Sequence, residues 1–415
     1  MRTLTEIGES AKIAKRALAK LTTDEKNNIL LKAAEALKNN YAEILKANEI
    51  DLKNGEKNGL KPSIMDRLAL SKDRIYAMAD GLEQIAKLPD PIGEILNMKT
   101  LPNGLIVGQK RVPMGVIGII YEARPNVTSD AFGLCLKAGS AVILRGGKEA
   151  INSNIATINV FKNAIKELNV DENIVQLVED TSRESANEMM KMNGYIDVLI
   201  PRGGAGLIQA VVQNSTVPVI ETGVGNCHIF VDESADINKA VNIIVNAKAQ
   251  RPGVCNAAET MLVHKNIANE FLPISIRALR EKNVEIRGDK AVKAIVNDVV
   301  DATDEDWATE YLDYILAVKI VDNIDDAIDH ITKYSTGHSE CIVSENYTNT
   351  QRFLQEIDSA AVYVNASTRF TDGNEFGFGA EIGISTQKLH ARGPMGLKEL
   401  TTTKYLIYGN GQIRK

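Results

Sequence analysis

The first ninety residues carry apolar side chains at the spacing of amphipathic helices. Leu4, Ile7 and Ala11 recur every three or four residues, and Thr22 followed by Glu25 has the pattern of a capping box ahead of a second apolar series. The spacing therefore predicts several helices over residues 1–90.

A different pattern begins near residue 115. Between residues 115 and 231, short β-branched runs such as GVIGIIY and SAVILR alternate with stretches of helical spacing, and the alternation resumes after residue 258. Strands that alternate with helices favour a parallel sheet covered by helices on both faces. The pattern predicts an α/β fold with two doubly wound domains.

Residues 92–112 have the pattern of a β-hairpin, because the turn residues Pro102, Asn103 and Gly104 separate two extended runs. The run TTTKYLIYGN near the carboxyl end predicts one more strand, which could pair with this hairpin. A two-stranded hairpin is marginally stable alone. We therefore expect residues 92–112 and 400–415 to form a small element that packs on another domain or on another subunit.

Composition and charge narrow the functional classes. The 415 residues are 44% hydrophobic and 25% charged, which is typical of a water-soluble chain with at least two domains. A net charge of −6 disfavours nucleic acid and anionic membranes as partners, and no apolar stretch reaches the ~18 residues of a membrane span. Neither the four cysteines nor the five histidines have metal-binding spacing, and the cysteines fit a reducing cytosol.

Glycine and polar residues gather where the predicted strands end. The segments are 121–126, 144–148, 200–206 and 221–226, and three of the four contain an arginine. In open α/β sheets, ligands bind beyond the carboxyl ends of the strands. Four such ends in series favour a polyanionic ligand such as a dinucleotide over ordinary turns, although the chain has neither a G-x-G-x-x-G fingerprint nor a P-loop.

Cys255 is the strongest candidate for a nucleophile. Pro252 and Gly253 force a loop just before it, and Arg251 could stabilise a thiolate there. The alternative is an inert, buried thiol, which is the commoner role of a lone cysteine. We expect that role for Cys135 and Cys341, which lie in apolar runs, whereas the pattern leaves Cys227 open.

With these residues in view, the chain resembles the gamma-glutamyl phosphate reductase family, a branch of the aldehyde dehydrogenase superfamily. The resemblance runs nearly end to end, and its most specific stretches are 321–342, 361–373, 376–394 and 251–260. It implies an aldehyde dehydrogenase-like fold.

The resemblance also implies a domain organisation. Residues 1–91 and 113–224 would form a cofactor-binding domain, with a segment near 375–399 packing back on it. Residues 225–374 would form a catalytic domain that carries Cys255, and 92–112 with 400–415 would form an oligomerisation element.

The resemblance assigns roles to individual residues. Cys255 matches the superfamily nucleophile, and Asn126 matches the residue that holds the oxyanion, although by pattern alone Asn126 would be a helix N-cap. Glu221 stands where oxidising relatives keep a base, and a reductase that releases phosphate does not need that base. Glu221 would then contact the nicotinamide side of the cofactor or cap a turn.

The cofactor assignments follow in the same way. Arg145 matches the cation at the adenosine ribose, and Lys148 stands where relatives that prefer NAD carry an acid, so the resemblance implies NADPH. The turn that contains Arg202, Gly203 and Gly206 would lie near the pyrophosphate, and Gly223 would lie near the cofactor as well. The alternative is that these are solvated turn residues. Candidates for binding the substrate anions are Arg124, Arg251 and His338.

The implied reaction is the reduction of L-glutamyl 5-phosphate to L-glutamate 5-semialdehyde, a step of proline biosynthesis. The implied partners are further copies of this chain, as a dimer or tetramer, and a separate glutamate 5-kinase that supplies the labile substrate. Two alternatives remain at this point. One is a hydrolytic aldehyde dehydrogenase with Glu221 as base, and the other is a nucleotide-binding regulatory or scaffold protein.

Overall fold

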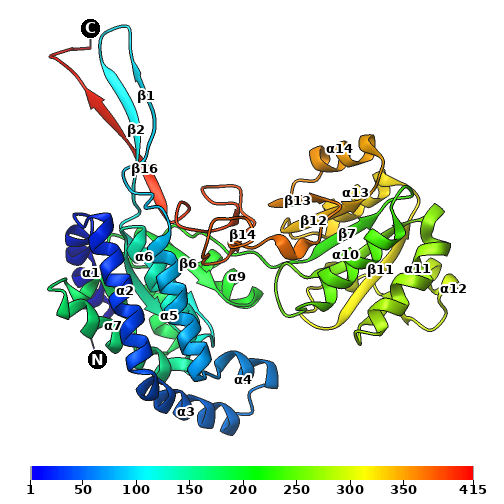
Figure 1. Ribbon diagram of the computed structural model, residues 1–415, viewed down its shortest axis with the longest axis horizontal. Helices are drawn as coiled ribbons and strands as arrows, with labels where there is room; N and C mark the ends of the chain where they lie inside the picture. Colours follow the sequence, from blue (N-terminus) through cyan, green and yellow to red (C-terminus); the bar gives the residue numbers. More distant parts are fainter. Residues whose placement is uncertain (1, 415) are drawn as a thin grey trace. The chain divides into compact units, whose positions relative to one another are not determined.

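The computed structural model describes residues 2–414, which divide into two compact units (Figure 1). Of these residues, unit 1 comprises 2–221, 377–383 and 395–414, and unit 2 comprises 222–376 and 384–394. Each unit is built around its own parallel sheet, so the predicted α/β class with two doubly wound domains is confirmed.

The sheet of unit 1 has four parallel strands in the order β5-β4-β3-β6. Their bounds are Val175–Leu177, Ala141–Arg145, Val116–Tyr121 and Val198–Arg202. Apolar residues of β3 and β4 are buried on both sides, as expected of a sheet sandwiched between helices.

Two groups of helices cover this sheet (Figure 1). One face packs on α1, α8 and α9, whose bounds are Leu4–Leu18, Arg183–Met189 and Ala205–Asn214. The other face packs on α6 and α7, behind which lie α2, α3, α4 and α5; the bounds are Pro125–Lys137, Ile151–Glu167, Thr23–Asn39, Tyr41–Lys57, Pro62–Leu68 and Lys72–Lys87. Capping boxes begin α1 at Thr3 and α2 at Thr22, which confirms the helical prediction for this region.

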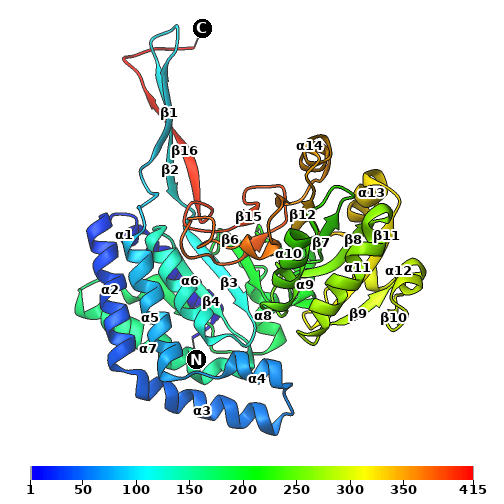
Figure 2. The same cartoon turned by 45° about the vertical axis from the view of Figure 1, so that its right-hand side comes forward.

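A three-stranded antiparallel sheet extends from unit 1 (Figure 2). Its order is β1-β2-β16, with bounds Ile95–Thr100, Ile106–Pro113 and Thr401–Tyr408. The pairing of Tyr408 with Ile106 and of Thr401 with Pro113 confirms that the carboxyl-terminal strand joins the hairpin. We call this sheet the arm.

The sheet of unit 2 has seven parallel strands in the order β10-β9-β11-β8-β7-β12-β13. In that order their bounds are Val300–Asp301, Glu285–Gly288, Ile315–Val321, Ala258–His264, Cys227–Val231, Ser339–Val343 and Ala361–Val364. One face packs on α10, α11 and α12, which span Ile237–Ala249, Lys265–Arg280 and Lys290–Ile295. The other face packs on α13 and α14, which span Ile324–Tyr334 and Tyr347–Glu356.

The segment after β13 belongs to both units in turn. Strands β14 (Ile384–Ser385) and β15 (Gly393–Pro394) pair with each other within unit 2, whereas the residues before and after them belong to unit 1. The chain leaves unit 1 at Glu221, just before the predicted boundary at residue 224. In the described part of the chain, no helix is both long and apolar enough to span a membrane.

Candidate active site

The loop that carries Cys255 joins the end of α10 to the start of β8. Cys255 is partly exposed, whereas Cys135, Cys227 and Cys341 are buried, so among the described residues it is the one thiol that reaches solvent. Burial raises the pKa of Cys135 and Cys227, and it raises the pKa of Cys341 to about 12. The expected core positions of Cys135 and Cys341 are confirmed, and Cys227 is resolved as a buried thiol.

The backbone of Cys255 is held by the loop that precedes β7. Cys227 Sγ donates to the carbonyl oxygen of Cys255 at 3.2 Å. Gly225 packs so closely on the same carbonyl that an added Cβ would stand 1.5 Å from its oxygen. Only glycine fits at residue 225 without displacing the loop of residues 250–257. We call this segment the nucleophile loop, after the role expected of Cys255.

A buried network lies beneath Cys227. His338 Nδ1 is 3.7 Å from Cys227 Sγ and 2.8 Å from Ser339 Oγ, and Ser339 Oγ is in turn 2.7 Å from Thr371 Oγ1. The sequence suggested that His338 is a cation at the substrate. The structure places its side chain fully buried, where it contacts Cys227 and Ser339 within unit 2.

The other end of the nucleophile loop is fastened by Asn256. Its Nδ2 donates to the carbonyl oxygens of Arg369 and Thr371, and Thr368 Oγ1 donates to the Asn256 carbonyl oxygen at 2.8 Å. Since Asn256 is buried and follows Cys255 directly, these bonds fix the loop on its carboxyl side.

Arg369 brings a second cation to the loop. Its Nη1 donates to Asn256 Oδ1 and its Nε to Gln250 Oε1. Burial and then the charge of Arg251 lower the pKa of Arg369, while the thiolate charge of Cys255 acts in the opposite direction. Sequence analysis assigned this electrostatic role to Arg251 alone. Arg369 was missed although it lies in the quoted stretch 361–373, because only folding brings η4 (Thr368–Phe370) to the loop.

Glu310 is a further residue that sequence analysis missed. Its Oε1 accepts a hydrogen bond from the Gly225 amide at 2.8 Å, which places a carboxylate behind the backbone that holds Cys255. Burial raises the pKa of Glu310, and the Gly225 amide opposes this shift. Nothing in the irregular segment around residue 310 marks it as a site from sequence.

Asn126 lies in unit 1, at the second position of α6. Its Nδ2 donates to Asp130 Oδ2 at 3.1 Å, one helical turn away. Arg124 occupies the N-cap position without a side-chain cap bond, so the alternative reading of Asn126 as the N-cap is wrong. Burial raises the pKa of Asp130 to about 6, although the Asn126 hydrogen bond and the charge of Arg202 lower it.

The predicted cofactor residues of unit 1 lie at the carboxyl ends of its strands. Arg145 ends β4, and its Nη2 donates to the carbonyl oxygens of Thr181 and Ser182 at 2.8 and 2.7 Å. Lys148 is exposed in the short 3-10 helix η1 (Lys148–Ala150), and Arg202 ends β6.

The turn after β6 binds an anionic group in this structure. The amide of Gly204 donates to Glu122 Oε2 at 3.0 Å, directly before α9. Gly203 packs against the Glu122 side chain, whereas the space around Gly206 is open. A helix N-terminus whose amide donates to a carboxylate has the polarity that suits a phosphate group.

The two remaining predicted cofactor residues, Glu221 and Gly223, lie on either side of the boundary between the units. Glu221 is the last residue of the first segment of unit 1. Gly223 belongs to unit 2, where its amide donates to the Ile384 carbonyl oxygen at 2.7 Å.

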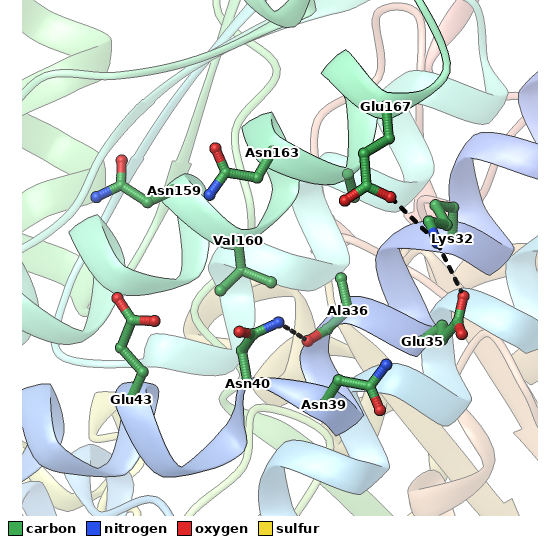
Figure 3. Close-up of a pocket in the computed structure, with 11 residues that line it drawn as sticks. Lys32, Glu35, Ala36, Asn39, Asn40, Glu43, Asn159, Val160, Asn163 and Glu167 are labelled. Carbon is green, nitrogen blue, oxygen red and sulfur yellow. Dashed lines mark hydrogen bonds and ion pairs between the residues drawn. The ribbon is translucent and has the colours of Figure 1, made fainter.

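A separate polar pocket of about 130 Å³ lies between α2 and α7 (Figure 3). Lys32 pairs there with Glu35 and Glu167, and Asn40 caps the Ala36 carbonyl. Lys32 is already paired with two carboxylates, and we assign this pocket no part in the chemistry. Across residues 2–414, no group of three or more acidic, histidine or cysteine side chains has the arrangement of a metal site.

Comparison with known proteins agrees with this architecture. The aldehyde dehydrogenase family profile matches residues 2–294 and 280–406. A gamma-glutamyl phosphate reductase of Clostridium botulinum is 65% identical over 407 residues, which is 98% of each chain. One of Lachnospira eligens is 60% identical over the full length of both chains.

A solved structure is also similar over the whole chain. The crystal structure of gamma-glutamyl phosphate reductase from Thermotoga maritima has a TM-score of 0.97 and 53% identity, with complete coverage of both chains. The chain therefore belongs to the aldehyde dehydrogenase family and, within it, to the gamma-glutamyl phosphate reductases.

Proposed function

We propose that this chain reduces L-glutamyl 5-phosphate to L-glutamate 5-semialdehyde and releases phosphate, a step of L-proline biosynthesis. One reduced nicotinamide cofactor and one proton are consumed for each acyl phosphate. The observation that carries the proposal is the partly exposed thiol of Cys255 on a clamped loop, in a chain that matches this family along its whole length.

Cys255 is the proposed nucleophile. Its thiolate attacks the γ-carbonyl carbon, a carbon–sulfur bond forms, the bond to the phosphate oxygen breaks, and phosphate leaves with the electron pair. Arg369 and Arg251 supply positive charge that favours the thiolate. An acyl phosphate is already activated, so the protein contributes mainly the nucleophile and its orientation.

Asn126 and the Cys255 backbone amide are the proposed oxyanion donors. A developing negative charge needs donors about 3 Å away. One N–H of the Asn126 side chain is used by Asp130, and this bond orients the second N–H. The negative charge of the tetrahedral intermediate would thus meet a pre-oriented amide.

The proposed cofactor is NADPH, and when bound it supplies the hydride that reduces the thioester to the aldehyde. Arg202, Gly203 and Gly206 would hold the pyrophosphate, and Arg145 and Lys148 the adenosine ribose with its 2′-phosphate. The exposed cation of Lys148 supports the phosphorylated cofactor over NADH. Gly223 and Glu221 would lie at the nicotinamide end.

The proposed contacts to substrate anions are Arg124 and Arg251. Arg124 is the N-cap residue of α6 and lies two residues before Asn126, and Arg251 lies near the start of the nucleophile loop. The third candidate, His338, is fully buried and contacts Cys227, so we propose that it affects the substrate only indirectly, by positioning Cys227.

Further copies of this chain and a glutamate 5-kinase are the proposed partners, in the cytoplasm. The product of the kinase, L-glutamyl 5-phosphate, is labile, which favours its direct transfer from the kinase to this chain. The arm supports self-association because it exposes apolar side chains, among them Tyr405, Ile407 and Tyr408.

The deciding experiment measures NADPH oxidation and phosphate release while a glutamate 5-kinase generates the substrate in place. We expect equal amounts of both products, and neither with Cys255→Ala. Oxidation of simple aldehydes with NAD⁺ and without phosphate would instead support the hydrolytic dehydrogenase with Glu221 as base. A protein that shows neither activity would support the regulatory or scaffold alternative.

A further inference from the structure

A cavity of about 290 Å³ lies in unit 1 beside the turn that leads to Asn126. It is lined by Leu60, Ile64, Arg67, Glu122, Ala123, Arg124 and Glu149. These residues come from the α3–α4 connection with α4, from the β3–α6 turn and from η1. The cavity therefore combines two guanidinium groups, two carboxylates and an apolar wall.

The wall that contains Arg67 is firmly held. Asp51 in α3 accepts hydrogen bonds from the amide and hydroxyl of Ser153 at 2.8 and 2.6 Å, at the start of α7. Asn48 donates to the Leu68 carbonyl oxygen at 2.9 Å and to Ser153 Oγ at 3.0 Å. These buried contacts fix α4 relative to the helix that follows η1.

Contacts of Arg74 hold the carboxyl end of α4, where Arg67 lines the cavity. Arg74 Nη1 donates to the Ala69 carbonyl oxygen at 2.7 Å, and its Nη2 pairs with Asp66 at 2.8 Å. Asp66 is thereby engaged with Arg74, so Arg67 is not neutralised by its neighbour in sequence. Its half-buried guanidinium lies at the cavity wall.

The opposite wall carries the acidic groups. Glu149 folds over Gly147, so that a Cβ on this glycine would be 2.6 Å from Glu149 Oε2 and 3.4 Å from the Ala123 amide. Glu149 thus lies beside the β3–α6 turn. Glu122 has one oxygen engaged by Gly204, which leaves Glu149 as the better placed carboxylate for a ligand.

We propose that this cavity binds the α-carboxylate and α-ammonium groups of an amino-acid substrate, with Arg67 and Arg124 on the carboxylate and Glu149 on the ammonium. Guanidinium groups match carboxylates in two-point hydrogen bonds, and a carboxylate complements an ammonium. Leu60 and Ile64 would contact the methylene groups. A simple aldehyde or an acyl phosphate without a zwitterionic head would make none of these charged contacts.

The short spacing between Arg124 and Asn126 along the chain is compatible with the length of a glutamyl group. Arg124 precedes Asn126 by two residues, so their Cα atoms are at most about 7 Å apart. In a glutamyl group, three carbon–carbon bonds of about 1.5 Å each separate the α-carbon from the γ-carbonyl carbon. A head group in the cavity therefore places its γ-carbonyl within reach of Asn126. This inference rests on the proposed function.

The test uses the reverse reaction with phosphate and NADP⁺, and it compares three aldehydes. They are L-glutamate 5-semialdehyde, 5-oxopentanoate, which lacks the ammonium, and 4-aminobutanal, which lacks the carboxylate. Arg67→Gln should lower kcat/KM roughly tenfold or more for the two carboxylate-bearing aldehydes and much less for 4-aminobutanal. Glu149→Gln should lower it for the two ammonium-bearing aldehydes and much less for 5-oxopentanoate.

Matched controls are Arg16→Gln and Glu9→Gln, two exposed residues of α1 whose loss should leave all three values unchanged. Arg124→Gln repeats the carboxylate test if Arg67→Gln does not fold. An equal loss for all three aldehydes, or no loss, would overturn the inference. A wild-type protein without activity on L-glutamate 5-semialdehyde would instead overturn the proposed function, so the two failures are distinguishable.

Discussion

At the residue scale, the site depends on the difference between one thiol and three others of the same type. Burial raises the pKa of Cys135, Cys227 and Cys341, which keeps them protonated and unreactive. Cys255 reaches solvent and has the cation of Arg369 nearby. The reactivity expected of Cys255 therefore comes from the surroundings of its sulfur and not from the residue type.

Selective alkylation tests this difference. Brief treatment of the native protein with iodoacetamide should modify Cys255 and leave the other three thiols unmodified, as read by peptide mass spectrometry. Activity should fall in step with the modification of Cys255. Cys255→Ser should lose roughly 1,000-fold or more in kcat and should no longer take up the reagent. Rapid modification of Cys227 in the folded protein would contradict this account.

Asp130 gives a pH-dependent prediction for stability. Its pKa is raised to about 6, so between about pH 4 and 6 the native state keeps a proton that the unfolded chain has released. Native stability therefore falls as the pH rises through this window, and the ionised carboxylate is unfavourable above it. Asp130→Asn should raise Tm relative to wild type near pH 8, and the difference should vanish near pH 4.

Calorimetry at a series of pH values measures this effect. Asp329→Asn, at an exposed position of α13, serves as the control, and its Tm difference from wild type should not vary with pH. A lower Tm for Asp130→Asn at every pH would mean that the Asn126 hydrogen bond outweighs the cost of burial.

At the element scale, short connections at the ends of strands position the chemistry. Gly225 in the loop before β7 and Cys227 at the start of β7 contact the Cys255 carbonyl, while η4 supplies Arg369. In unit 1, the turns after β3, β4 and β6 carry Asn126, Arg145 and Arg202. Parallel strands bring such turns to one edge of a sheet, which is why residues distant in sequence come close together.

Gly225→Ala tests the contact between two of these connections. The new methyl group would overlap the Cys255 carbonyl, so the nucleophile loop must shift, and kcat should fall roughly 100-fold. Gly81→Ala is the matched control, because its methyl group would meet no atom closer than 3.9 Å, within helix α5. That control should keep full activity and gain about 0.5–1 kcal/mol in the free energy of unfolding. Equal activity in both variants would show that the close contact between Gly225 and the Cys255 carbonyl is not needed for catalysis.

A substitution in the turn after β4 tests which nicotinamide cofactor the protein prefers. Lys148→Glu should raise the KM for NADPH roughly tenfold or more and change that for NADH much less, because it puts a carboxylate where a 2′-phosphate is proposed to bind. Steady-state kinetics with both cofactors measure the ratio. Lys20→Glu, an exposed change at the end of α1, controls for the altered net charge. An unchanged ratio would remove Lys148 from the cofactor site.

At the scale of the whole molecule, the arm exposes apolar side chains that unit 1 does not cover. Cross-strand register places Met98, Ile106 and Tyr408 on one face and Tyr405 and Ile407 on the other, so both faces expose apolar side chains. Strands β1 and β16 also present unpaired edges. A second copy of the chain would cover these surfaces.

Polar substitution of the arm tests self-association. Tyr405→Lys combined with Ile407→Lys should shift the molecular mass, measured by analytical ultracentrifugation, towards the monomer. Leu31→Lys is the control, because Leu31 is an isolated exposed apolar residue on α2. Unchanged association in the double variant would assign the arm another role.

The sequence by itself determined the elements and the family, because both are local properties. Helical spacing, capping boxes and β-branched runs predicted two α/β domains and the strand that joins the hairpin, and motifs within short stretches carried the resemblance. The turn residues around Cys255 likewise marked it as exposed.

Only the tertiary structure decided what surrounds these residues. It buried His338 beneath Cys227, turned Asn126 towards Asp130, and brought Arg369 and Glu310 to a loop that lies more than fifty residues away in sequence. It also assembled Arg67, Arg124 and Glu149 around one cavity. Such contacts depend on which strands become neighbours, and the order of strands in a sheet is not written in the spacing of any single segment.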